Sequence, residues 1–115
     1  MTGDNNTDLT GLIEAFHLMW DHFPGPSSLV HKTKKVIAAN PACIAMGREP
    51  GMYCSRTGSP ESHKGCLAAK ALAEHRAERI QVEADGTHRA VFWLPVDGFD
   101  DYYIHFGVTM DAPQS

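Results

Sequence analysis

Apolar side chains recur every three or four positions near the start of the chain, which is the spacing of one face of an α-helix. The members of this series are Leu9, Leu12, Ile13, Phe16, Met19, Trp20 and Phe23. Thr7 is a favoured type of N-cap residue, and the segment Pro24–Gly25–Pro26 stops a helix. The pattern therefore predicts an amphipathic helix over residues 7–23, after a tail at residues 1–6.

Two short runs rich in Val, Leu and Ile follow this helix. They are Ser28–His31 and Lys35–Ala39, and the polar segment Lys32–Lys34 separates them. Residues of these types in runs of four to eight favour strands, and the short polar connection favours a hairpin. We therefore expect an antiparallel pair of strands here.

The segment after the hairpin has the markers of a very short helix. Asn40 is a good N-cap, Pro41 suits the first helical turn, and Gly47 suits the position just beyond the last turn. These residues predict a short helix over 42–46. The following stretch, residues 48–59, contains Pro50, Gly51 and Gly58 and should be irregular.

A longer helix and a group of strands complete the chain. The helix is predicted from Ser59 or Ser62 to about Ala77, and the strands are predicted at Arg79–Ala84, His88–Val96 and Asp101–Thr109. The turn signals Asp85–Gly86 and Asp97–Gly98 between the strands favour an antiparallel meander. Five strands segregated from the central helices define an α+β fold class.

Length and charge exclude several functional classes. A chain of 115 residues is the size of one domain, with two ends that resemble tails. Its formal charge of −4, without a run of basic residues beyond Lys34–Lys35, argues against binding to nucleic acid or to an anionic membrane. There is no apolar stretch long enough to span a membrane, and the polar N-terminus is not a signal peptide. We therefore expect a cytoplasmic location.

Sequence motifs of catalysis are missing. The chain has no G-x-S-x-G, no glycine-rich phosphate loop, no H-E-x-x-H and no pair of carboxylates at catalytic spacing. The acidic group Asp97, Asp100 and Asp101 surrounds Gly98 and is first of all a hairpin loop. We therefore predict that the protein is not an enzyme.

The order of elements and two segments of sequence resemble a PAS domain. Residues 36–42, Val-Ile-Ala-Ala-Asn-Pro-Ala, are similar to the second strand of that family and its exit into a short helix. Residues 107–111, Gly-Val-Thr-Met-Asp, are similar to the last strand and the junction that follows it. The resemblance extends from Leu9 to Asp111, and it implies a five-stranded antiparallel sheet with short helices on one face and an N-terminal amphipathic helix.

The resemblance also implies a role. PAS domains are sensory or protein-interaction domains, many of them bacterial, that enclose a small pocket and signal to an output. Here a PAS-like domain at residues 27–111 and a tail at 112–115 leave no room for an output domain. The resemblance therefore implies either that the domain signals to a separate signalling protein or that the chain is a fragment of a longer protein. PAS domains frequently dimerise through a flanking helix, so the helix over 7–23 predicts a homodimer; the alternative is that it only covers the sheet.

The strand pattern suggests where a small ligand would bind. Alternate residues of the last two strands are apolar, and we expect them to line the inner face of the sheet. The predicted ligand pocket consists of Phe92, Leu94, Ile104 and Phe106, with Met46 opposite them. A core that these side chains fill completely, in a structural adaptor without a ligand, is the alternative.

Three residues form a candidate metal site. Cys54, His63 and Cys66 have the spacing C-x8-H-x2-C, which resembles, in part, a thiol-containing segment of some bacterial PAS sensors. His63 and Cys66 are three positions apart, so on a helix they would project from one face, and zinc accepts this mixture of imidazole and thiolate. Cys43 is the candidate for a fourth ligand. The alternatives are a redox pair of Cys54 with Cys66, or buried thiols without a function.

Two larger cofactors are also suggested by the PAS resemblance. Haem would need an axial histidine, for which His63 and His75 are the candidates; a surface position near the end of a helix is the alternative for His75. Flavin photochemistry is disfavoured, because residues 51–58 differ from the flavin-binding segment of light-sensing PAS domains at nearly every position around Cys54.

Overall fold

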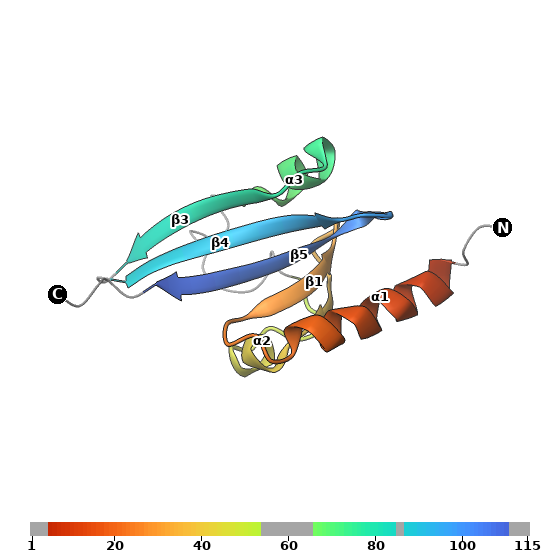
Figure 1. Ribbon diagram of the computed structural model, residues 1–115, viewed down its shortest axis with the longest axis horizontal. Coiled ribbons are helices and arrows are strands. Elements are labelled where there is room, and N and C mark those ends of the chain that lie inside the picture. The colour runs from red at the N-terminus through yellow and green to blue at the C-terminus, as the bar shows by residue number, and fades with distance from the viewer. Residues whose placement is uncertain (1–4, 54–65, 85–86, 111–115) are drawn as a thin grey trace.

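The computed structural model describes residues 5–53, 66–84 and 87–110 (Figure 1). Three helices and five strands follow one another in the order α1 (Asn5–Trp20), β1 (Ser27–His31), β2 (Val36–Ala39), α2 (Pro41–Ala45), α3 (Ala68–Glu74), β3 (Glu78–Ala84), β4 (Thr87–Val96) and β5 (Phe99–Met110). This order of elements confirms the predicted α+β class with a five-stranded antiparallel sheet and an N-terminal helix.

The strands form one sheet in the order β2-β1-β5-β4-β3. Every neighbouring pair is antiparallel, so β3, β4 and β5 form the predicted meander and β1 and β2 the predicted hairpin. Strand β1 of the hairpin pairs with β5 of the meander, and in this pair Leu29 lies opposite Ile104. The last strand of the chain therefore occupies the centre of the sheet, beside the first (Figure 1).

Apolar side chains cover both faces of this sheet. On one face, which we call the α1 face, Leu29, Ala38 and Ile104 pack against Phe16 of α1. On the other, which we call the α3 face, Val30, Trp93 and Tyr103 pack against Ala68 and Ala71 of α3. Since neighbouring residues of a strand point to opposite faces, Leu29 and Val30 belong to different cores.

Helix α1 differs from its predicted bounds of 7–23. It includes Asn5 and Asn6, which were expected in a tail, and it ends at Trp20. Beyond Trp20 the chain makes a turn in which the Phe23 amide donates to the Trp20 carbonyl at 3.0 Å. The apolar series continued to Phe23, but this residue packs from the turn, with its ring 5.2 Å from that of Trp20.

The two later helices are short. Helix α2 has the predicted caps: Asn40 Oδ1 accepts the Cys43 amide at 2.9 Å, and Gly47 has a φ of +95°, which glycine adopts without strain. Helix α3 ends at Glu74 because His75 adopts a left-handed conformation with a φ of 55°, three residues before the end predicted at about Ala77. Its predicted start at Ser59 or Ser62 lies outside the described residues. In the described part of the chain, no helix is long and apolar enough to cross a membrane.

Candidate functional site

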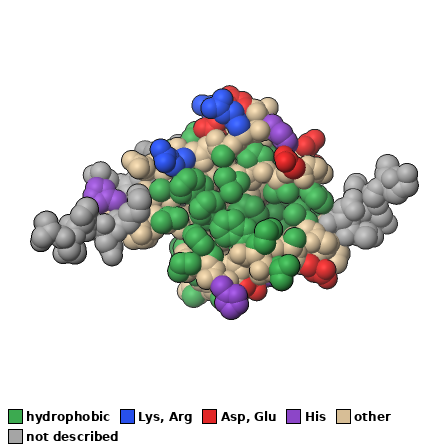
Figure 2. Space-filling view, in the orientation of Figure 1, with side chains coloured by type: hydrophobic (Ala, Val, Ile, Leu, Met, Phe, Trp, Pro, Cys, Tyr) green, Lys and Arg blue, Asp and Glu red, His purple; other side chains and the backbone are tan. Residues whose placement is uncertain are grey.

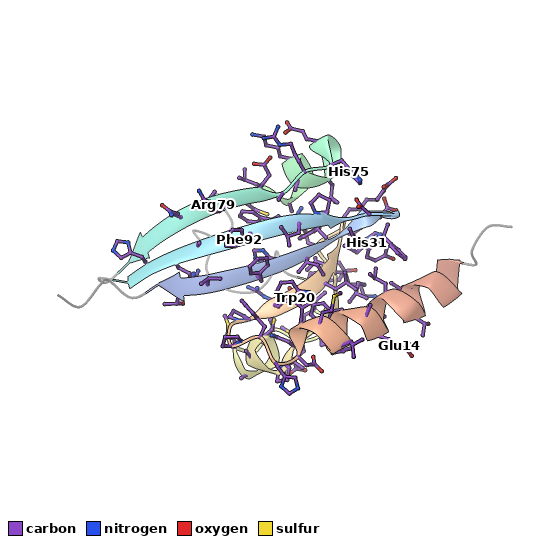
Figure 3. All side chains as sticks on the ribbon, viewed as in Figure 1. Glu14, Trp20, His31, His75, Arg79 and Phe92 are labelled. Carbon is purple, nitrogen blue, oxygen red and sulfur yellow. The ribbon has the colours of Figure 1, made fainter. Side chains whose placement is uncertain are left out.

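The residues predicted to line a pocket lie on the α1 face of the sheet. Leu94, Ile104 and Phe106 belong to the cluster around Phe16 of α1, and the ring of Phe92 stacks on that of Phe106 at 4.7 Å. Figure 3 shows Phe92 on β4 and Trp20 on α1, and the Trp20 ring lies 5.0 Å from Phe106. These side chains therefore pack against the N-terminal helix instead of lining the face that α3 covers.

Met46 does not complete that set. It follows α2, its side chain is 57% exposed, and it is not among the residues packed against the Phe16 cluster. The predicted pocket, with Met46 opposite the four strand residues, stays a prediction. Alternation along β4 and β5 shows which residues share a face, but not which segment of the chain covers that face.

Of the predicted metal ligands, only Cys66 lies within the described residues. It precedes α3 and packs, half-buried, against the core of the α3 face. Cys54 and His63 lie outside the described residues. Cys43, the candidate fourth ligand, is buried in α2 beside Val36 and Ala39, and its thiol donates to the Arg48 carbonyl at 3.6 Å. Among the side chains that the structure describes, no three His, Cys, Asp or Glu residues gather as a metal site would require.

His75, one of the two candidate haem ligands, lies on the surface. It stands at the C-terminal end of α3, half-exposed (Figure 3), and its Nε2 is 3.6 Å from Asp97 Oδ1 in the turn between β4 and β5. The structure therefore places His75 in the capping role that was the alternative to haem ligation. His63, the other candidate, is outside the described residues.

A histidine without a role in the sequence prediction is the most unusual polar group of the α3 face. His105 in β5 lies directly opposite Trp93 in β4, and the two rings stack at 5.1 Å with 19° between their planes. Its Nδ1 lies 3.0 Å from the Phe92 carbonyl oxygen, so Nδ1 carries the proton and donates it. The remaining ring nitrogen, Nε2, is then a lone-pair acceptor on the α3 side.

The surroundings of His105 keep its ring neutral. Burial among apolar side chains lowers its pKa from 6.5 to about 4, against the opposing effect of the bond to the Phe92 carbonyl. The positive charges of Arg48 and Arg89 lower the pKa further. The chain neighbours Ile104 and Phe106 belong to the opposite face of the sheet, so no local pattern in the sequence indicated that the ring of His105 is buried.

Arg48 supplies a second unusual group. It follows α2, and its amide donates to the Cys43 carbonyl at 3.3 Å, which holds the start of the loop against the helix. Its Nε is buried and has no hydrogen-bond partner within the described part of the chain. A buried, charged donor without an acceptor is costly, and most buried donors in folded proteins have a partner.

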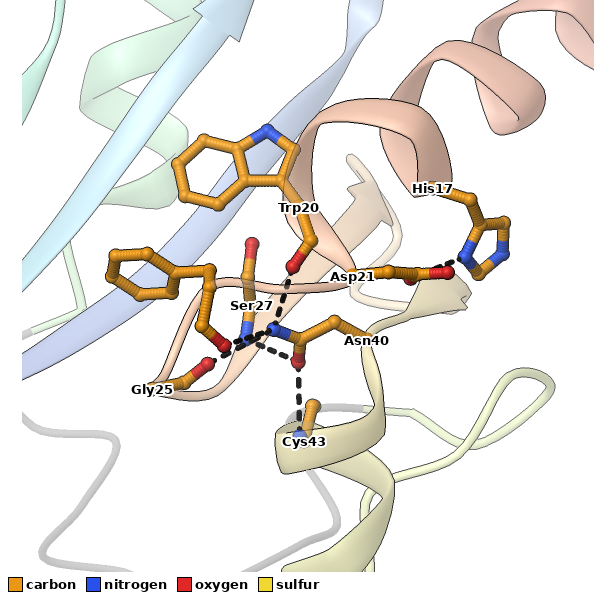
Figure 4. A network of polar contacts seen from close by, with 8 residues as sticks. His17, Trp20, Asp21, Gly25, Ser27, Asn40 and Cys43 are labelled. Carbon is orange, nitrogen blue, oxygen red and sulfur yellow. Dashed lines mark hydrogen bonds and ion pairs between the residues drawn. The ribbon is translucent and has the colours of Figure 1, made fainter.

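The side chain of Asn40 joins three segments of the chain (Figure 4). Its Oδ1 accepts the amides of Ser27 in β1 and Cys43 in α2, both at 2.9 Å. Its Nδ2 donates to the carbonyls of Trp20 and Gly25 at 3.0 and 2.9 Å. The end of α1, the start of β1 and the start of α2 are therefore fixed to one buried amide.

The aromatic cluster of the α1 face is only partly covered. Trp20, Phe23, Phe92 and Phe106 are all half-buried, and in Figure 2 hydrophobic side chains gather in the middle of the view, over β4 and β5. On α1 itself, Leu18 and Met19 are 85% and 69% exposed. Met19 was expected on the buried side of the helix but points away from the sheet.

Several solved structures share this arrangement of helices and strands. A sensory box sensor histidine kinase from Vibrio cholerae has a TM-score of 0.64 at 9% identity, over 96% of this chain and 100% of that one. The PAS domain of BvgS from Bordetella pertussis has a TM-score of 0.63 at 18% identity, over 90% and 88% of the two chains. A domain of an HTR-like protein from Haloarcula marismortui has a TM-score of 0.58 at 20% identity, over 78% and 99%.

These comparisons identify the fold as that of PAS domains, as the sequence resemblance implied. No protein-family model and no curated protein matches the sequence. In this chain, α3 covers the face of the sheet on which His105 stacks on Trp93.

Proposed function

We propose that this protein is a non-enzymatic sensory domain that binds a small ligand on the α3 face and signals to a separate partner protein. The observation that supports this role best is the pair of polar groups in an otherwise apolar interior: the neutral imidazole of His105, stacked on Trp93, and the unpartnered Nε of Arg48. A core that served packing alone would gain stability from apolar side chains at these positions. The structural likeness to a sensory box and to a PAS domain supports the same role.

Native mass spectrometry of the protein without a polyhistidine tag tests ligand binding. We expect a compound that is retained under native conditions and released on denaturation. When added back at about 100 times its Kd, it should raise the melting temperature by about 5 °C or more, because a ligand that binds only the folded state stabilises it. No retained compound, together with no stabilising compound in a small-molecule screen, would contradict the sensory role.

We further propose that two copies associate through α1. Leu18 and Met19 lie exposed next to each other on this helix, and exposed apolar side chains favour association. The partner copy would then contact a helix whose end is fixed to β1 and α2 by Asn40. A change on the sheet could in this way reach the dimer contact.

Light scattering tests the dimer. The double substitution Leu18→Glu and Met19→Glu should convert a dimer to a monomer, because it places two carboxylates in an apolar contact. Both side chains are exposed, so the fold should persist, unlike a substitution at the buried Phe16. His22→Glu, at an exposed position just beyond α1, is the matched control and should remain dimeric. A monomeric wild-type protein at all concentrations, or a dimeric double variant, would refute this association.

A further inference from the structure

The two edges of the sheet differ in whether their backbone groups are paired. At one edge, the loop after α2 covers β2: the Val36 amide donates to the Met52 carbonyl at 2.7 Å, and the Gly51 amide donates to the Val36 carbonyl at 2.8 Å. At the other edge lies β3 (Figure 1), which pairs with β4. Within the described part of the chain, no backbone group bonds to the outer side of β3.

Strand β3 lacks the features by which sheet edges usually avoid pairing. It is seven residues long, contains no proline, and pairs with β4 without a bulge from Glu78 to Ala84. Every second residue of an antiparallel edge strand points its amide and its carbonyl away from the sheet. A row of such donors and acceptors matches one kind of occupant, an extended chain that adds a further strand.

The side chains of β3 indicate the character of that extended chain. Ile80 lies opposite Val91 and packs, half-buried, against the core of the α3 face. Arg79 and Gln81 belong to the α1 face, where both are exposed (Figure 3). A residue added opposite Ile80 would therefore extend an apolar surface, and a residue added opposite Arg79 would meet an exposed positive charge.

The charge of Arg79 is not neutralised by a described neighbour. Arg79 has no ion pair among the residues that the structure describes. Glu78 belongs to the other face of the sheet, where its side chain is 13% exposed and lies 4.0 Å from Arg76 Nε. Opposite charges at facing positions stabilise an antiparallel pair of strands, and like charges destabilise it, so a carboxylate is the favoured group opposite Arg79.

We propose that β3 binds an extended segment of the separate partner protein as a further antiparallel strand, with an acidic residue opposite Arg79 and an apolar residue opposite Ile80. This inference rests on the proposed signalling to a separate partner and specifies the surface that the partner contacts. A second copy of the chain is the alternative occupant. It would extend the α1 dimer into a larger assembly, whereas a segment of another protein leaves that dimer unchanged.

NMR titration of the full chain with a designed peptide tests this surface. The probe is Val-Thr-Val-Thr-Val-Glu-Thr with blocked ends, which places its glutamate opposite Arg79 when it pairs antiparallel with Glu78–Ala84. We expect the peptide to slow hydrogen exchange at every second amide of β3. The same peptide with lysine in place of glutamate should bind about 3- to 10-fold more weakly, because two positive charges then face each other.

Charge reversal in the protein separates recognition at β3 from general attraction. Arg79→Glu should reverse the preference, so that the lysine peptide binds about 3- to 10-fold more tightly than the glutamate peptide. Arg79 is exposed, so the fold should persist. Arg89→Glu is the matched control: Arg89 is an exposed arginine of β4 on the α3 face, opposite Val82, and the preference for glutamate should remain.

Several results would overturn the inference. They are binding of neither peptide at about 2 mM, the same preference in the wild type and Arg79→Glu, and slowed exchange on a strand other than β3. Protection of the β3 amides that grows with protein concentration in the absence of peptide would also overturn it, because a second copy would then occupy the edge. Native mass spectrometry measures the retained ligand separately, so failure of the β3 contact and failure of the sensory function are distinguished.

Discussion

Replacing Asn40 with alanine should lower the free energy of unfolding by about 3–5 kcal/mol, a large part of the stability of a domain of this size. The alanine would leave the buried amides of Ser27 and Cys43 without their acceptor. It would also remove the donor for the carbonyls of Trp20 and Gly25. Urea unfolding followed by circular dichroism measures the loss, and a loss below about 1 kcal/mol would contradict this account.

Two further variants separate the roles of the Asn40 amide. Asn40→Asp retains an oxygen for the two amides but turns a second oxygen toward the carbonyls, so at neutral pH it should destabilise at least as much as alanine. An aspartate variant as stable as the wild type would show that Nδ2 has no part in the network. Gln81→Ala removes an exposed amide from β3 and, as the matched control, should change the free energy of unfolding by less than about 0.5 kcal/mol.

The Asn40 network also bears on how a signal would leave the sheet. α1 is connected to β1 by a turn of only six residues, 21–26, and that turn is held to Asn40 through Gly25. The same amide caps α2, after which Arg48 follows. A ligand that moved Arg48 would therefore act on α2. Because Asn40 binds both the start of α2 and the end of α1, this residue connects the proposed ligand site to the proposed dimer contact.

Much of the fold followed from local signals in the sequence. The strands were predicted because β-branched and aromatic residues gather between turn signals, and these signals depend on a few neighbouring residues. The short helix α2 was predicted from Asn40, Pro41 and Gly47 alone, since capping is local chemistry. The bounds of β1 through β5 agree with the prediction to within two residues at each end.

The candidate site was less predictable, because it depends on which helix covers which face. Both sets of alternate residues in β4 are apolar, Phe92 and Leu94 on one face and Val91 and Trp93 on the other, so the pattern could not indicate the face beneath α3. His105 had no role in the prediction from the sequence. Its importance depends on long-range partners, Trp93 across the strand pair and Arg48 from a distant loop, which no local pattern reveals.

Acid should destabilise the protein through His105 by about 3 kcal/mol between neutral pH and pH 4. The unfolded chain binds a proton on this side chain with a pKa near 6.5, whereas in the folded protein the pKa is lowered to about 4. Between these two values the unfolded state holds more protons, so the free energy of unfolding falls as the pH falls. The difference of about 2.5 pKa units, at 1.36 kcal/mol each, sets a limit of about 3.4 kcal/mol, of which about 3 kcal/mol is lost between pH 7 and pH 4.

Other groups also titrate in this range, so the effect is isolated by comparison with His105→Phe. Phenylalanine retains a ring to stack on Trp93 but binds no proton, and its free energy of unfolding should fall about 3 kcal/mol less than that of the wild type from pH 7 to pH 4. Tyr102→Phe, in the same strand, is the matched control and should displace the whole curve without changing its slope. Parallel curves for the wild type and His105→Phe would mean that His105 is protonated in the folded state as readily as in the unfolded chain, and the burial of its ring on the α3 face would then not disfavour the charged form. A reduced slope in His105→Phe, with the NMR titration of the wild-type ring centred near pH 4, would instead establish that the fold holds a neutral imidazole against Trp93, in surroundings that disfavour its charged form.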